Sequence, residues 1–107
     1  MAYKCILAMV KPDLTGMVVD SAKEVGATGA TIIPASGTGA HEAKTFFGLS
    51  LDIRTDVVLF LVDNERVEPV LSAIKKAGRF NEPGTGIAFV LPVEQTAGLQ
   101  SQTSPHR

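Results

Sequence analysis

The sequence has one cysteine, no excess of basic residues and no long apolar run, and each of these absences excludes a class of protein. A lone cysteine, Cys5, cannot form a disulfide within the chain, which is typical of proteins in a reducing compartment. The 10 basic and 11 acidic residues leave a net charge of -1, without the basic excess of a nucleic-acid binder. The first apolar run stops at Lys11 and is too short for a signal peptide or a membrane span. We therefore expect a cytoplasmic protein that neither binds nucleic acid nor inserts into a membrane.

The length of 107 residues predicts one domain with a thin core. A domain of this size buries only about two thirds of the surface that its unfolded chain exposes. Association with other subunits is therefore expected. The polar segment 100–107 predicts a disordered tail, so the folded domain is expected over residues 1–99.

The apolar pattern predicts two successive strand-helix-strand units. In the first unit, residues 3–10 form a strand, Asp13 caps a helix that ends at Gly26, and residues 28–35 form a short strand. A turn-rich loop over 36–45 then leads into the second unit.

The second unit begins with a strand in two pieces, an alternating piece over 49–53 and an unbroken apolar piece over 57–62. A helix follows, capped by Asn64 and ended by Gly78, and the last strand covers 87–93. Two such units are most simply closed as a ferredoxin-like βαββαβ sandwich. This is an α+β fold with one four-stranded antiparallel sheet and both helices on one face.

That arrangement leaves the second face of the sheet without a covering layer. The third and fourth strands are apolar on both faces, so the uncovered face needs a partner. A copy of the same chain is the simplest partner, which predicts a homo-oligomer.

The sequence has two Gly-Thr-Gly triplets, one just after a predicted strand and one directly before another. Gly37-Thr38-Gly39 leaves the second strand, and Gly84-Thr85-Gly86 enters the last one. Glycine permits positive φ and a close approach of backbone to ligand, and successive N–H groups in such a turn can bind phosphate. Plain turn chemistry is the commoner explanation of one triplet. The presence of two in one small sheet favours a phosphate site.

Other reactive side chains have structural explanations. Cys5 lies within a strand and has no base beside it, so it is predicted to be a small core residue, and the chain is not expected to be an enzyme. His41 and Glu42 offer two metal ligands in a loop, and more only if symmetry brings several copies together. Solvation in the loop is the other explanation for this pair.

From about Tyr3 to Leu99, the chain resembles the PII signalling proteins, which are trimeric regulators of nitrogen metabolism. The resemblance rests on Lys11-Pro12 at the end of the first strand and on the segment 24–29, Glu-Val-Gly-Ala-Thr-Gly, that leads into the second. It also rests on Gly37-x-Gly39, which opens the family's T-loop, and on a glycine-rich B-loop before the last strand.

The resemblance implies a homotrimer that holds an adenine nucleotide (AMP, ADP or ATP) in each cleft between subunits and controls a target enzyme or membrane transporter through its T-loop. The nucleotide would lie between the base of one T-loop and the neighbouring B-loop. The family's ligand positions that carry over are Gly29, Thr31, Gly37, Thr38 and Gly39 on one side, Val62 beside the base, and Gly84, Thr85 and Gly86 on the other.

Several positions depart from the family pattern. Ile87 stands where typical members have a B-loop lysine, and Ala40 and His41 replace an arginine and a glutamine of the T-loop. The lysine that helps to bind 2-oxoglutarate falls near Thr55, and the T-loop has no tyrosine for uridylylation. Each lost cation removes a charge-assisted phosphate contact, which is roughly twice as strong as a neutral hydrogen bond.

Lys75, Lys76 or Arg79, at the end of the second helix, could restore some of this charge, but their spacing alone does not show which one does so. The chain thus resembles a divergent PII-like protein, a group whose members sense adenine nucleotides with small effectors such as bicarbonate, or bind a divalent metal. The alternative is a metal-binding ferredoxin-like trimer, similar to the CutA copper-tolerance proteins, that uses His41 and Glu42.

Overall fold

The computed structural model describes residues 2–36, 45–46, 49–50 and 54–99, with the backbone alone for 45–46 and 49–50. The elements in chain order are β1 (Tyr3–Val10), α1 (Thr15–Glu24), β2 (Thr31–Ala35), β3 (Thr45–Phe46), β4 (Leu49–Ser50), β5 (Thr55–Asp63), α2 (Val67–Ala77) and β6 (Gly86–Pro92). Within these ranges, no helix is long and apolar enough to span a membrane. The predicted tail, 100–107, lies outside the described residues.

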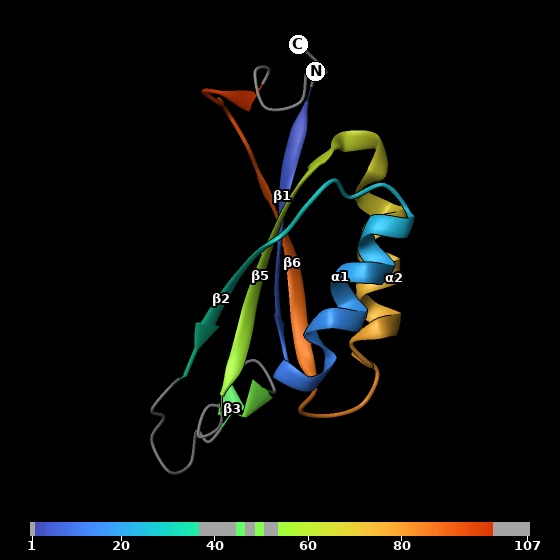
Figure 1. The fold of residues 1–107 in the computed structure, drawn as a ribbon, viewed down its shortest axis with the longest axis vertical. Coiled ribbons are helices and arrows are strands. Elements are labelled where there is room, and N and C mark those ends of the chain that lie inside the picture. The colour runs from blue at the N-terminus through green and yellow to red at the C-terminus, as the bar shows by residue number, and fades with distance from the viewer. Residues whose placement is uncertain (1, 37–44, 47–48, 51–53, 100–107) are drawn as a thin grey trace.

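Four strands form one antiparallel sheet in the order β2-β5-β1-β6, and both helices pack on the same face of it (Figure 1). The predicted α+β ferredoxin-like sandwich is therefore confirmed. The prediction of a two-part third strand is wrong, because β4 pairs with β3 in a separate two-stranded sheet. Only the unbroken apolar piece belongs to β5.

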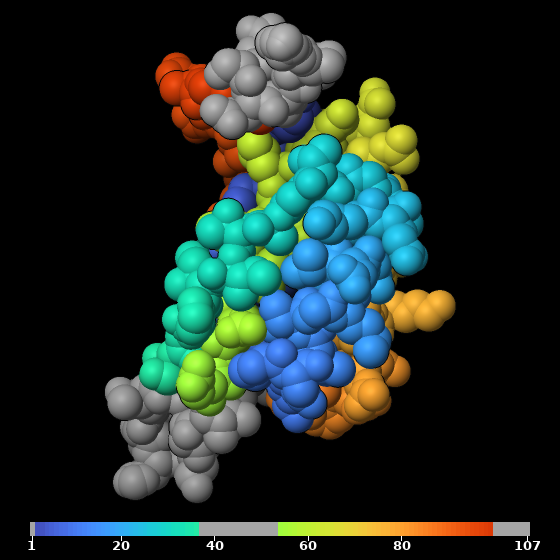
Figure 2. Space-filling model, in the orientation of Figure 1, coloured from blue at the N-terminus to red at the C-terminus, as the bar shows by residue number. Residues whose placement is uncertain are grey.

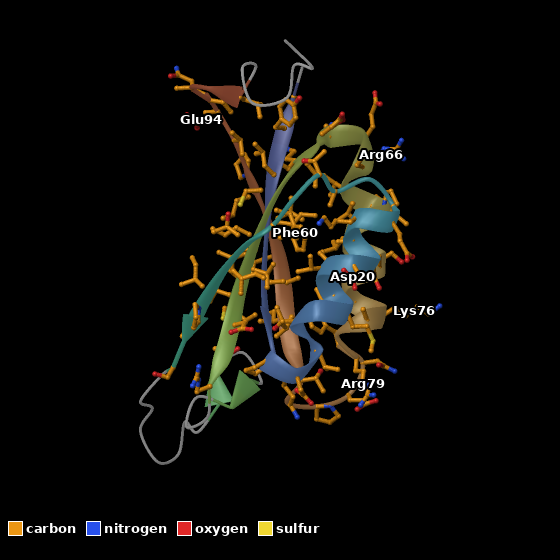
Figure 3. All side chains as sticks on the ribbon, in the orientation of Figure 1. Asp20, Phe60, Arg66, Lys76, Arg79 and Glu94 are labelled. Atoms are coloured by element: carbon orange, nitrogen blue, oxygen red, sulfur yellow. The ribbon has the colours of Figure 1, made fainter. Side chains whose placement is uncertain are left out.

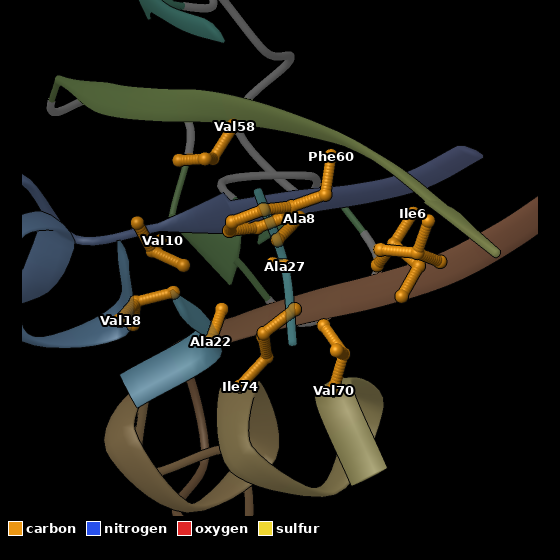
Figure 4. Packing of buried hydrophobic residues seen from close by; sticks show 11 residues of the cluster. Ile6, Ala8, Val10, Val18, Ala22, Ala27, Val58, Phe60, Val70 and Ile74 are labelled. Carbon is orange, nitrogen blue, oxygen red and sulfur yellow. The ribbon is translucent and has the colours of Figure 1, made fainter. Parts of the chain in front are cut away.

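The core lies between the sheet and the two helices (Figure 4). Alternate residues of the two central strands point into it, which is the period-two pattern of a strand. Figure 2 shows the side chains of α1 and of the segment after it closing over this side of the sheet. The fully buried side chains with the largest volumes are Phe60, Ile6, Ile74, Val10, Val18, Val58 and Val70.

The end of α1 confirms the predicted role of Gly26. Its φ is 120°, a value that favours glycine. The N–H of Gly26 donates to the carbonyl of Lys23, and the N–H of Ala27 donates to the carbonyl of Ala22 at 3.0 Å. These two bonds form a Schellman motif, which satisfies carbonyls at the end of the helix.

The end of α2 has the same motif, but Gly78 does not occupy the left-handed position. Arg79 does so, with φ 59°, while Gly78 remains in the helical region. The N–H of Phe80 donates to the carbonyl of Lys75 at 3.0 Å, which closes the motif. Gly78 is required for another reason, because a Cβ there would lie only 2.9 Å from Cδ1 of Phe80.

The predicted N-caps of both helices are displaced. Asp13 lies inside a 3-10 turn, Pro12–Leu14, and α1 begins after it at Thr15. Before α2, the carboxylate of Asp63 accepts the N–H of Glu65 at 3.4 Å, so the capping side chain is Asp63 and not Asn64. The proline in the first turn accounts for the displaced start of α1, because its fixed φ begins a turn at once.

Candidate ligand-binding site

The end of β2 and the glycine-rich loop before β6 lie at the same end of the sheet but at opposite edges (Figure 1). One row of paired residues crosses all four strands at this end and consists of Pro34, Asp56, Val10 and Gly86. The loop after β2 therefore leaves from one edge, and the loop before β6 enters at the other, three strand spacings or about 14 Å away. Within one copy, the end of β2 and the loop before β6 would therefore form separate walls of a candidate site.

The B-loop, residues 79–86, is held by one buried side chain. The hydroxyl of Thr85 lies 2.6 Å from the carbonyl oxygen of Arg79 and 2.9 Å from that of Glu82. The N–H of Glu82 also donates to the carbonyl of Arg79 at 2.9 Å. Gly84, with φ 73°, makes the left-handed turn between them. The Thr85 hydroxyl therefore shapes the loop and is not turned outward to a ligand.

Gly86 is set by packing at the start of β6. A Cβ at this position would overlap the carbonyl oxygen of Met9 and would lie 2.6 Å from Cε1 of Phe80. A backbone oxygen cannot move away without breaking the β1–β6 ladder, so any side chain here would disturb the sheet. Close packing alone accounts for this glycine.

The opposite wall is described only at its base. Gly37, Thr38 and Gly39, and also His41 and Glu42, lie outside the described residues. Gly29 and Thr31 are exposed, and a Cβ at Gly29 would meet no atom within 4 Å. Both stand at the far end of β2 from the T-loop, so only an elongated ligand that lies along this strand could contact both ends.

Val62 does not present its side chain to solvent. It is 3% exposed and belongs to the core between the sheet and the helices. In the sheet it pairs with Lys4 of β1. A ligand on the outside of this copy could therefore meet the backbone of Val62 but not its side chain.

Comparison with known proteins agrees with this fold. The family model described as nitrogen regulatory protein P-II matches residues 3–103. The chain belongs to the P-II family. It is 32% identical to nitrogen regulatory protein GlnK2 of Haloferax mediterranei, over 92% of this chain and 84% of that protein. It is 28% identical to nitrogen regulatory protein P-II of Rhizobium meliloti, over 92% of each.

A solved P-II structure has the same architecture. The crystal structure of Arabidopsis thaliana PII bound to citrate superposes with a TM-score of 0.68 at 26% sequence identity. The match covers 86% of this chain and 78% of that one. The family assignment makes the chain a member of a group of signal-transduction regulators.

Two threonine hydroxyls hold the start of β5 in this P-II chain. The buried hydroxyl of Thr55 donates to the carbonyl of Val10 at 3.0 Å. The hydroxyl of Thr15 donates to a carboxylate oxygen of Asp56 at 2.6 Å. Thr55 thus uses its one donor inside the protein.

Two cations stand beside the walls of the site. Lys75 lines a cavity of about 300 Å³ together with Gly86 and Ile87 of the B-loop side. Arg54 lines a second cavity of about 370 Å³ with Ser36, the last described residue before the T-loop. From the sequence alone, Lys75 is one of three candidate cations and Arg54 is not among them. The helical spacing of Leu71 and Lys75, which line the same cavity, was the available signal.

The described residues contain no group of three or more His, Cys, Asp and Glu side chains that could hold a metal ion. The predicted metal ligands, His41 and Glu42, are not among the residues described. Metal binding by this pair therefore stays a prediction from the sequence.

Proposed function

We propose that this P-II chain is a regulator and not an enzyme, and that it binds an adenine nucleotide in the clefts of a homotrimer. Its T-loop would pass the bound state on to a target enzyme or membrane transporter in the cytoplasm. The observation that supports this most is that the end of β2, which leads into the T-loop, and the B-loop before β6 lie at one end of the sheet but at opposite edges. In a ring of copies, the β2 edge of one subunit, which leads into the T-loop, would lie next to the β6 edge of its neighbour, which carries the B-loop.

The uncovered face of the sheet supports a homo-oligomer. Leu61, Cys5 and Leu91 form one row across this face, and Leu59, Leu7 and Phe89 form the next. Leu61 is 36% exposed and Leu91 41% exposed in the single copy. An apolar surface of this kind on a soluble domain marks an interface, and identical copies cover it without a second protein.

The loops support a phosphorylated ligand. A left-handed glycine such as Gly84 can expose backbone N–H groups to an anion, because glycine itself has no side chain to cover them. The citrate-bound relative shows that a P-II protein can hold a small anion. We therefore place the phosphates at the two loops and the base along β2, beside Gly29 and Thr31.

Bicarbonate or another small anion is the second effector that we propose. In this chain Thr55 is neutral and donates its hydroxyl to Val10, so it offers no cation to a dicarboxylate. A smaller anion needs fewer charged partners.

Isothermal titration calorimetry with AMP, ADP and ATP tests the proposal. We expect binding of one adenylate per chain by a species of three times the 11.3 kDa chain mass, measured in parallel by light scattering. Silence toward all three nucleotides at millimolar concentration would overturn it. Titration with copper and zinc under the same conditions tests the metal alternative.

A further inference from the structure

The proposed cleft lacks the cations that usually hold phosphate in this family, since Ile87 and Ala40 occupy their positions. Backbone N–H groups alone leave the charge of a di- or triphosphate largely unpaired. Two described cations lie beside the loops: Lys75 on α2 lines a cavity with Ile87, and Arg54, directly before β5, lines one with Ser36.

Lys75 is the first of these cations. It lies on α2 and lines a cavity with Ile87 itself, with Gly86 and with Phe80. The spatial relation between Lys75 and the B-loop is fixed by hydrogen bonds at both ends. The N–H of Phe80 donates to the carbonyl of Lys75 at 3.0 Å, and the hydroxyl of Thr85 donates to the carbonyl of Arg79.

Lys76 and Arg79 lie near Lys75 in sequence but face elsewhere. Both line a groove between the helices together with Met17 and Glu24, away from the B-loop cavity. Figure 3 shows Lys76 pointing outward from α2 on the side away from the sheet. All three cations would interact favourably with the carboxyl end of α2, but only Lys75 also reaches the B-loop cavity.

Arg54 is the second cation, and it lies on the other wall. It immediately precedes Thr55, which pairs with Ala35, so Arg54 lies beside Ser36 at the base of the T-loop. Among the described residues, neither Arg54 nor Lys75 forms an ion pair with a carboxylate. A guanidinium at this place can bind a phosphate group through two parallel hydrogen bonds.

We propose that Lys75 and Arg54 supply the positive charge for the phosphates of the bound nucleotide, Lys75 from one subunit and Arg54 from the next. This inference rests on the proposed function. It places the charge on α2 and directly before β5, where it is independent of the loop residues that other family members use. The expected ligand is a nucleoside di- or triphosphate and not a nucleoside.

The first test compares matched substitutions by calorimetry with ATP, ADP, adenosine and inorganic tripolyphosphate. We expect Lys75→Gln and Arg54→Gln each to weaken ATP binding at least fivefold. Lys76→Gln and Arg66→Gln should leave it within twofold, since Lys76 faces the other groove and Arg66 lies at the opposite end of the molecule (Figure 3). Light scattering on each variant separates loss of a contact from loss of assembly.

The outcomes distinguish this inference from the proposed function. Unchanged ATP affinity in both Lys75→Gln and Arg54→Gln overturns the inference and leaves nucleotide binding intact. A second outcome is that tripolyphosphate binds as tightly as ATP and that both substitutions weaken its binding. This result supports the role of the two cations but contradicts a site for a nucleotide, because the nucleoside part adds no affinity. A wild-type protein that binds neither ATP nor tripolyphosphate contradicts both.

The second test asks whether the two cations come from different subunits. Mixed trimers of Lys75→Gln and Arg54→Gln chains contain clefts in which both wild-type cations meet. Random mixing at equal amounts should restore wild-type affinity in about a quarter of the clefts, as expected for a three-membered ring. If both cations belonged to one subunit, mixing would restore none.

Discussion

The hydroxyl of Thr85 lies 2.6 Å from the carbonyl oxygen of Arg79 and so joins the B-loop to the end of α2. Thr85→Val keeps the shape of the side chain but leaves the carbonyls of Arg79 and Glu82 without this donor. We expect the free energy of unfolding to fall by about 1–2 kcal/mol, the usual cost of such a loss. Urea unfolding measures it, with Thr96→Val, at an exposed position, as the control. Equal effects of the two substitutions would contradict this role for Thr85.

Arg79 holds a left-handed backbone conformation with φ 59°. Glycine relieves the clash between Cβ and backbone there, so Arg79→Gly should be more stable than Arg79→Ala by about 1 kcal/mol. The comparison with alanine removes the effect of the lost charge. At Ser72, in the middle of α2, the order should reverse, with glycine less stable than alanine by about 1 kcal/mol. The same order at both positions would be evidence against the left-handed assignment.

The buried hydrogen bond from Thr55 to Val10 joins the start of β5 to the end of β1. Thr55→Val removes the donor and leaves the carbonyl of Val10 with one partner fewer. We expect a loss of about 1 kcal/mol in unfolding free energy. Thr31→Val, on the exposed strand β2, should change it by less than about 0.5 kcal/mol. Chemical denaturation of both variants measures the two changes in unfolding free energy. If Thr55→Val lost no more stability than Thr31→Val, the structural role of this hydrogen bond would be refuted.

Two of the predicted ligand glycines differ in the space around them. A Cβ at Gly86 would overlap the Met9 carbonyl oxygen, whereas a Cβ at Gly29 would meet nothing. Gly86→Ala should therefore lower the unfolding free energy by about 2 kcal/mol or more, as overpacking does in a well-packed site. Gly29→Ala should leave the thermal midpoint almost unchanged. A stable Gly86→Ala variant would mean that Gly86 is conformationally free and not fixed by packing.

The sequence was sufficient for the parts of the fold that depend on periodicity. The two-residue period of β1 and the helical spacing around Val18 and Ala22 gave the correct layers. Gly26 was identified because a glycine after a helical pattern is a common end signal. The short hairpin of β3 and β4 was missed, since two-residue strands have too few positions to show a period.

The site was less predictable because its roles depend on contacts between distant residues. Thr85 was expected to face a ligand, but closure of the B-loop turns its hydroxyl toward Arg79. Lys75 and Lys76 are adjacent, and which of them faces the B-loop depends on how α2 packs against β6. Arg54 lies beside Ser36 only because β5 pairs with β2 in this register.

Native mass spectrometry with ADP or ATP tests the central claim most directly, because it reports subunit number and bound ligand together. We predict trimers that carry up to three nucleotides, and no nucleotide on any monomer, because each cleft needs the T-loop edge of one copy and the B-loop edge of the next. A monomer that holds a nucleotide, or a trimer that holds none at saturating concentration, would contradict a site shared between subunits.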